Sequence, residues 1–198
     1  MSLICYQGTG ANPFCKFDLN HILEGDGKCK FGIGIYVTTV YRTAAHYSGA
    51  NDSSINHYVY TVEIPTPSDS NCLQFKEPVN KDVILMAEAT LGCHFPPEAT
   101  KQGSCFRKYL ANVLSGNVST LKHMITKADI VGEKAASQFL KTIGVLLLSW
   151  PYSWKNPSAG TNYAVLSEED IRIKKIESVS LDSKKQLIEG SQKIVKIF

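Results

Sequence analysis

The chain has 198 residues, which is enough for one well-filled domain. Hydrophobic residues make up 43% and charged residues 20%, an ordinary balance for a soluble globular protein. The formal net charge of +3 is too small and too scattered to indicate a nucleic-acid partner. We expect a single domain, 1–198, and no nucleic-acid partner.

The start of the chain lacks the basic and apolar regions of a signal peptide. The longest apolar run, Ile143 to Trp150, is too short to cross a bilayer. We therefore expect no membrane partner and a cytoplasmic location, either in the producing cell or in a host cytosol after delivery as an effector or toxin. Six cysteines without a C-x-x-C pair and five scattered histidines show no metal-ligand spacing, so no metal is expected. A nucleophilic pair of Cys5 or Cys93 with a distant histidine has no local support.

In chain order, the first expected element is a strand at 2–7, ended by turn residues. Residues 14–30 mix apolar with polar side chains and suit a short helix or irregular cover. A strand at 34–38 precedes a helix of small residues over 41–50. Tyrosine and valine then alternate with polar residues at 57–65, which predicts a half-buried strand.

From Asp82 to about Leu148 the pattern becomes helical, and we expect an insertion of several helices over about 82–148. A loop rich in Pro, Gly and Asn follows at 149–162, then a strand at 163–166. After the acidic turn "SEED", a last strand is expected at 171–181. Strands that flank a helical middle predict an α+β fold with a mostly antiparallel sheet.

Three short stretches carry the candidate chemistry: "CYQGT" (5–9), "FGIGIYVTTVYRTAAHY" (31–47) and "TNYAVLSEEDIRIKKI" (161–176). In order and spacing they resemble the catalytic domains of poly(ADP-ribose) polymerases, in the histidine-tyrosine-glutamate branch of the ADP-ribosyltransferase superfamily. The resemblance covers most of 3–90 and 145–177. It implies a split β-sheet core and leaves the helical middle unexplained.

The same resemblance implies that NAD is the co-substrate and that Tyr36 and Tyr47 sandwich its nicotinamide ring. A flat, electron-poor cation suits two tyrosine faces, with a cation–π contribution of roughly 0.5–2 kcal/mol. The backbone of Gly8 would bind the carboxamide, because no Cβ blocks the approach. Thr9 and Thr38 would add hydroxyl contacts to the ribose or the carboxamide.

The chain departs from the family at three positions. Gln7 stands in place of the histidine, Asn162 in place of the catalytic glutamate, and Ala44 in place of a serine that binds the carboxamide. The expected catalytic set is thus Gln7, Tyr36 and Asn162. An amide can orient a ribose hydroxyl, but it cannot offset the positive charge that forms on the ribose. Loss of one preorganised electrostatic group typically costs about 10²–10³ in rate.

Other carboxylates are candidates to replace the missing charge, although the sequence does not rank them: Asp18, Asp26, Glu63, Glu168 and Glu169. Each candidate also has a plain structural explanation. Tyr36 and Tyr47 could be core packing, Gly8 could mark a turn, and Gln7 and Asn162 could be polar strand ends.

The leading functional hypothesis is a mono-ADP-ribosyltransferase, an NAD-dependent glycosyltransferase that modifies a side chain of a target protein docked on the helical insertion. The alternative is a catalytically impaired pseudoenzyme that binds NAD, ADP-ribose or a protein partner. A third reading, an RNA 2′-phosphotransferase, is weaker, because that chemistry relies on several arginines and the chain has only Arg42, Arg107 and Arg172.

Overall fold

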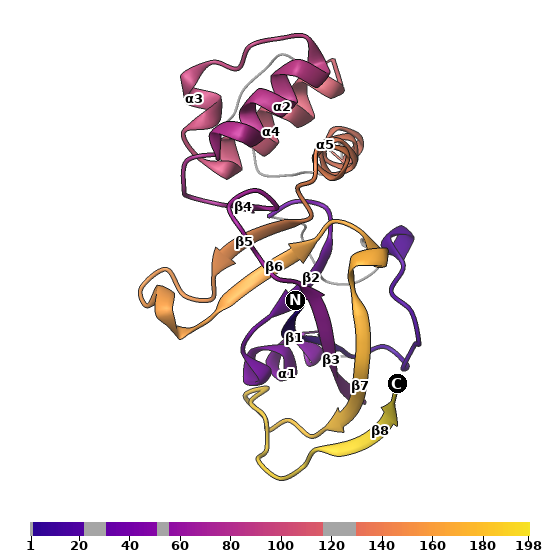
Figure 1. The fold of residues 1–198 in the computed structure, drawn as a ribbon. Helices are drawn as coiled ribbons and strands as arrows, with labels where there is room; N and C mark the ends of the chain where they lie inside the picture. Colours follow the sequence, from indigo (N-terminus) through magenta and orange to yellow (C-terminus); the bar gives the residue numbers. More distant parts are fainter. Residues whose placement is uncertain (1, 22–30, 51–55, 117–129) are drawn as a thin grey trace.

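The computed structural model describes residues 2–21, 31–50, 56–116 and 130–198 (Figure 1). Within these ranges, eight strands form one sheet in the order β4-β5-β6-β2-β1-β3-β7-β8. The strands are β1 (Ser2–Thr9), β2 (Ile35–Thr38), β3 (His57–Pro65), β4 (Cys72–Gln74), β5 (Leu147–Pro151), β6 (Thr161–Val165), β7 (Arg172–Val179) and β8 (Lys193–Ile197). All neighbouring pairs are antiparallel except β4 with β5.

Five α-helices are described: α1 (Tyr41–Ser48), α2 (Lys81–Leu91), α3 (Pro97–Thr100), α4 (Gly103–Leu114) and α5 (Ile130–Thr142). Helices α2 to α5 gather beyond the β4–β5 end of the sheet, whereas α1 lies against β1 and β3 (Figure 1). Local signals set their ends. In α2, the Asn80 side chain accepts a hydrogen bond from Asp82 N at 2.8 Å, and Gly92 ends the helix at a φ of 64°.

The expected α+β class and mostly antiparallel sheet agree with this architecture. Three strands were not expected: β4, β5 and β8. The helical stretch was expected to reach Leu148, but β5 begins at Leu147. A short, continuous apolar run does not distinguish a buried strand from a buried helix. The parts of the expected elements at 22–30 and 117–129, with the candidate Asp26, lie outside the described residues.

The two faces of the sheet are defined by the alternation along β2. Ile35 and Val37 point to one side, named here the Val37 face, and Tyr36 and Thr38 to the other, the Tyr36 face. Helices α2, α4 and α5 pack on the Tyr36 face with Val83, Phe106, Leu140, Leu148 and Ala164. A second cluster on the Val37 face includes Cys5, Tyr60, Leu147, Tyr163 and Ile176. A third lies under α1 and contains Ala44, Ala45, Val59 and Val179.

Candidate functional site

The three strands that carry the motif positions are neighbours in the sheet, in the order β6-β2-β1. Asn162 lies opposite Thr38, and Thr38 lies opposite Tyr6. Paired residues project from the same face of a sheet, so Asn162, Thr38 and Tyr36 share the Tyr36 face. Gln7 follows Tyr6 and therefore projects from the Val37 face. The structure thus brings three of the expected residues together and directs Gln7 to the other side.

The sheet opens between β1 and β2. These two strands pair only at Tyr6 with Thr38, whereas β1 pairs with β3 from Ser2 to Thr9. Beyond Tyr6, the backbone of β1 therefore has no ladder partner on its β2 side among the described strands. Gly8 and Thr9 lie along this opening.

Gly8 is packed against the backbone of α1. A Cβ on Gly8 would lie 1.7 Å from the carbonyl oxygen of Ala44 and 2.9 Å from the backbone nitrogen of Ser48. Only glycine allows α1 to approach β1 so closely. The glycine thus has a structural reason that is independent of any ligand.

Tyr36 is half-buried and its phenol is engaged with the loop before β2. Its hydroxyl accepts a hydrogen bond from Phe31 N at 3.0 Å and donates one to Gly32 O at 2.9 Å. Its ring lies 5.2 Å from that of Trp150, which in turn stacks on Phe31 at 4.1 Å. The hydroxyl of Tyr36 therefore anchors the loop before β2 through two backbone hydrogen bonds. Part of the ring surface packs against Trp150.

Tyr47 lies on α1 and is 62% exposed. Its ring meets that of His46 edge-on, with centroids 5.9 Å apart, and does not contact the ring of Tyr36. Tyr36 packs against the cluster formed with α2, α4 and α5, whereas Tyr47 lies on α1. Exposure leaves one face of Tyr47 available for stacking.

The amide side chains of Gln7 and Asn162 form no hydrogen bond with other described residues. Gln7 Oε1 is buried without a hydrogen bond. Asn162 is buried, and no hydrogen bond joins its side chain to another described residue. Its cross-strand neighbours, Thr38 and Trp150, carry no charge. Of these two amides, only that of Gln7 has a fully buried atom without a partner, Oε1, and buried polar groups are usually paired in native proteins.

The hydroxyls of Thr9 and Thr38 each accept a hydrogen bond from the backbone two residues later in the chain. Thr38 Oγ1 accepts from Val40 N at 3.2 Å, and Thr9 Oγ1 accepts from Ala11 N at 3.1 Å. In both contacts the hydroxyl is the acceptor, so its own proton remains available to a ligand.

None of the described replacement carboxylates lies beside Asn162. Asp18 pairs with His21, and Glu169 pairs with Lys141. Glu63 pairs with Lys174 and lies opposite Ile4, near the N-terminal end of β1. Glu168 and Glu169 belong to a 3-10 turn, η4 (Glu168–Asp170), that follows the C-terminal end of β6, whereas Asn162 lies near its N-terminal end.

The helical insertion directly contacts the loop before β2, residues 31–34, and no local sequence pattern predicted these contacts. Ser137 Oγ on α5 donates to Ile33 O at 2.9 Å. Arg107 Cδ on α4 lies 3.0 Å from the place where a Cβ on Gly32 would be. Arg107 is hydrogen-bonded to the fully buried Glu133, and Lys108 Nζ lies 2.9 Å from the other oxygen of Glu133. These residues were hard to recognise, because polar positions on a helix usually face solvent.

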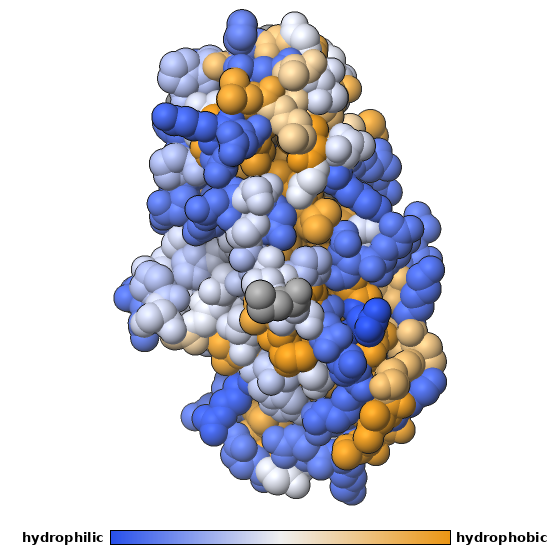
Figure 2. All heavy atoms as spheres, viewed as in Figure 1, coloured by the Kyte–Doolittle hydropathy of each residue, from blue (hydrophilic) through white to orange (hydrophobic). Residues whose placement is uncertain are grey.

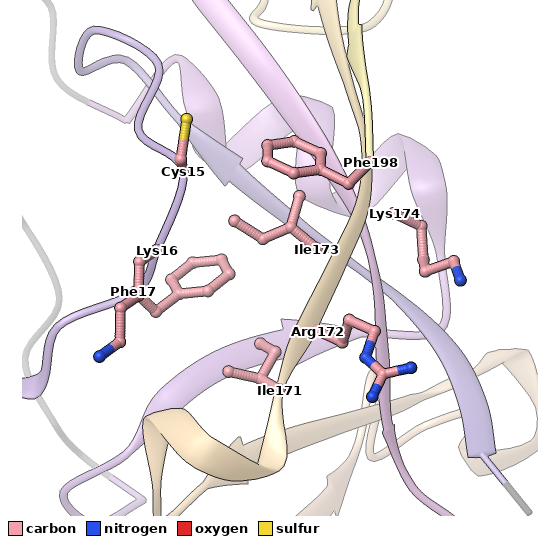
Figure 3. Close-up of a pocket in the computed structure, with 8 residues that line it drawn as sticks. All are labelled: Cys15, Lys16, Phe17, Ile171, Arg172, Ile173, Lys174 and Phe198. Carbon is pink, nitrogen blue, oxygen red and sulfur yellow. The ribbon is translucent and has the colours of Figure 1, made fainter.

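A separate cavity of about 300 Å³ lies on the Val37 face between the 15–17 segment, β7 and the end of β8 (Figure 3). Phe17 and Phe198 point into it, whereas Arg172 and Lys174 point away. None of the expected site residues lines this cavity.

Among the residues with described positions, no group of three His, Cys, Asp or Glu side chains could hold a metal ion. No described helix is long and apolar enough to span a membrane.

Comparisons with known proteins find no match to this chain, whether among protein-family models, curated proteins or solved structures. A functional assignment therefore depends on the motifs, the strand order and the side chains described above.

Proposed function

We propose that this chain binds NAD across the opening between β1 and β2 and transfers ADP-ribose to a single site on a protein partner. The observation that carries the proposal is the adjacency of β6, β2 and β1, which draws the three motif positions to one region of the sheet from distant parts of the sequence. A ligand lying across an open sheet can reach both faces. This would reconcile Gln7 on one face with Tyr36 and Asn162 on the other.

In this proposal the nicotinamide ring stacks on the exposed face of Tyr47, and Tyr36 bounds it on the opposite side. The bond between the ribose C1′ and the nicotinamide nitrogen breaks, and its electron pair neutralises the pyridinium. A nucleophilic side chain of the partner forms the new bond at C1′ and loses its proton to solvent. Asn162 orients a ribose hydroxyl through its amide, and Gln7 hydrogen-bonds the second ribose.

The neutral Asn162 favours one transfer over chain growth. In the family that the motifs resemble, the glutamate also activates a ribose hydroxyl for elongation, and an amide cannot accept that proton. The same neutrality favours a second candidate, a protein that binds NAD or ADP-ribose without turning it over. This second candidate is supported by the two cross-strand neighbours of Asn162. Both of them, Thr38 and Trp150, are uncharged.

Binding is tested first, by calorimetry of the full chain with NAD and with ADP-ribose. We expect Tyr47→Ala to weaken NAD binding roughly tenfold, because it removes a stacking and cation–π face. Leu85→Ala is the matched control, since Leu85 is also 62% exposed on a helix. Unchanged NAD affinity in Tyr47→Ala, or no binding of either ligand by the unmodified chain, would refute the proposed site.

Catalysis is tested by nicotinamide release and by transfer of label from NAD to proteins of a cell lysate. Asn162→Glu should raise nicotinamide release by about 10²–10³, because it restores a negative charge beside the developing cation. Asn162→Gln, of equal length and neutral, should not. Binding without release or transfer by the unmodified chain would favour the non-catalytic candidate. If Asn162→Glu binds NAD but gains no more than Asn162→Gln, Asn162 does not lie beside the ribose.

A further inference from the structure

β8 forms one edge of the sheet, and all five of its residues are exposed. It pairs with β7 on one side. Phe198 N donates to Lys174 O at 3.0 Å, so the backbone of Phe198 faces β7. By alternation, the N–H and C=O of Ile197 face away from the sheet. Such an edge can accept another strand.

The two faces of β8 differ in chemistry. Ile194 and Ile197 lie opposite Glu177 and Lys175, on the face that α1 partly covers, and are 62% and 68% exposed. Lys193 and Lys196 lie opposite Ser178 and Ile176 and project from the other face. The strand therefore presents isoleucines on one side and lysines on the other.

The lysine side has uncompensated positive charge. Neither Lys193 nor Lys196 forms an ion pair with a carboxylate in the described part of the chain. Lys196 Nζ instead lies 3.2 Å from Cys15 Sγ and 4.4 Å from the centroid of the Phe198 ring. Residues 172–198 contain seven Lys and Arg against three Asp and Glu, a net +4 that exceeds the +3 of the whole chain. The partner of this edge should therefore be acidic.

The isoleucine side contributes exposed apolar surface. Figure 2 shows hydrophobic side chains gathered at the surface near β8 and the C-terminal end. Val195 lies at a break in the register and is 48% exposed. An added strand would cover this apolar surface as well as satisfy the free backbone edge.

From these observations we propose that β8 is a docking edge for an extended acidic segment of a partner protein, added to the sheet as the next strand. Its side chains must alternate, because successive residues of a strand face opposite sides. Glutamate or aspartate would face Lys193 and Lys196, and β-branched apolar residues would face Ile194 and Ile197. The proposal does not depend on NAD binding.

Two other occupants fit less well. Antiparallel pairing of β8 with a second copy would set lysines against lysines along the new ladder, and like charges directly opposite are destabilising. A membrane surface is also disfavoured. The lysines and the isoleucines project from opposite faces of β8, so one flat surface cannot contact both.

The test is fluorescence anisotropy of a labelled peptide, Glu-Val-Glu-Ile-Glu-Val-Glu, with the full chain. The control peptide has the same composition with its four glutamates grouped at one end, and therefore the same charge. We expect micromolar binding of the alternating peptide and at least tenfold weaker binding of the grouped one. Equal affinities would mean attraction by charge alone and would overturn the proposal.

Variants of β8 separate the contribution of the lysine charges from that of the backbone hydrogen bonds to the added strand. Changing Lys193 and Lys196 together to Glu should abolish binding. Changing the exposed Lys155 and Lys184 together to Glu makes the same change in net charge outside β8 and should retain most of the binding. Ile197→Pro removes an outward N–H and should also abolish binding. If the proline variant fails to fold, the lysine pair still decides the matter. Binding to phosphatidylserine vesicles but not to the peptide, or peptide-independent dimers, would also refute the proposal.

Discussion

At the scale of single residues, the candidate site combines packing with chemistry. Gly8 allows α1, the helix that carries Tyr47, to approach β1. Tyr36 anchors the loop before β2 through its hydroxyl while its ring remains half-buried. Substitutions at such residues therefore affect stability as well as any ligand, and the two effects must be measured separately.

Gly8→Ala should lower the free energy of unfolding by about 3 kcal/mol, because the new Cβ would overlap the α1 backbone and force it to shift. Gly144→Ala is the control. Gly144 has a φ of 85° with nothing within 4 Å of a Cβ, so only the backbone strain of about 1 kcal/mol applies. Urea unfolding of both variants measures the difference, and equal losses would contradict the close packing of α1 on β1.

At the scale of elements, the helical insertion has a structural role in addition to any surface that it offers to a partner. It supports the loop that leads into β2. Ser137 holds the carbonyl of Ile33, and Arg107 fills the space beside Gly32. Both residues depend on the position of α4 against α5, which Glu133 links through Arg107 and Lys108. The insertion therefore influences the loop that Tyr36 anchors.

Glu133→Gln should lower the free energy of unfolding by about 3–5 kcal/mol, because it leaves Arg107 and Lys108 without their buried countercharge. Glu169→Gln breaks the surface pair with Lys141, where Glu169 is 80% exposed, and should cost less than about 1 kcal/mol. Chemical denaturation compares the two. A loss below 1 kcal/mol for Glu133→Gln would show that the pair does not hold α4 against α5.

At the scale of the whole molecule, folding buries thiols and phenols in the centre of the sheet. Burial raises the pKa of Cys5 from its ordinary 9.0 to about 12, and it also raises the pKa of Cys72, Tyr60 and Tyr163. In the unfolded chain these groups lose their protons first. Rising pH therefore favours unfolding once it passes the unfolded pKa values.

The free energy of unfolding should thus be insensitive to the Cys5 thiol below about pH 9 and should fall as pH rises from 9 to 12. One fully shifted group contributes a slope of about 1.4 kcal/mol per pH unit. Cys5→Ala should make this decline shallower, although the cavity it creates lowers stability at every pH. Cys15→Ala, at an exposed position, is the control. Denaturant unfolding at several pH values measures both slopes, and parallel curves would show that Cys5 is not buried in solution.

Local patterns were sufficient for several elements and insufficient for others. Alternation in 57–65 matches β3, and the small residues after Val40 match α1. β4 has only three residues, too few for a visible period, and β5 is a continuous apolar run. Such strands exist because neighbouring strands cover their backbones, which a local window does not contain.

The sequence by itself determined the class of the fold, the identity of the candidate residues and the neutral side chain at Asn162. Only the tertiary structure decided which of them meet. Asn162 shares a face with Tyr36 because of the register between β6 and β2, and Gln7 faces away because β1 pairs through Tyr6. Register between strands distant in the chain is set by the packing of both sheet faces, and a one-residue shift would reverse every side chain.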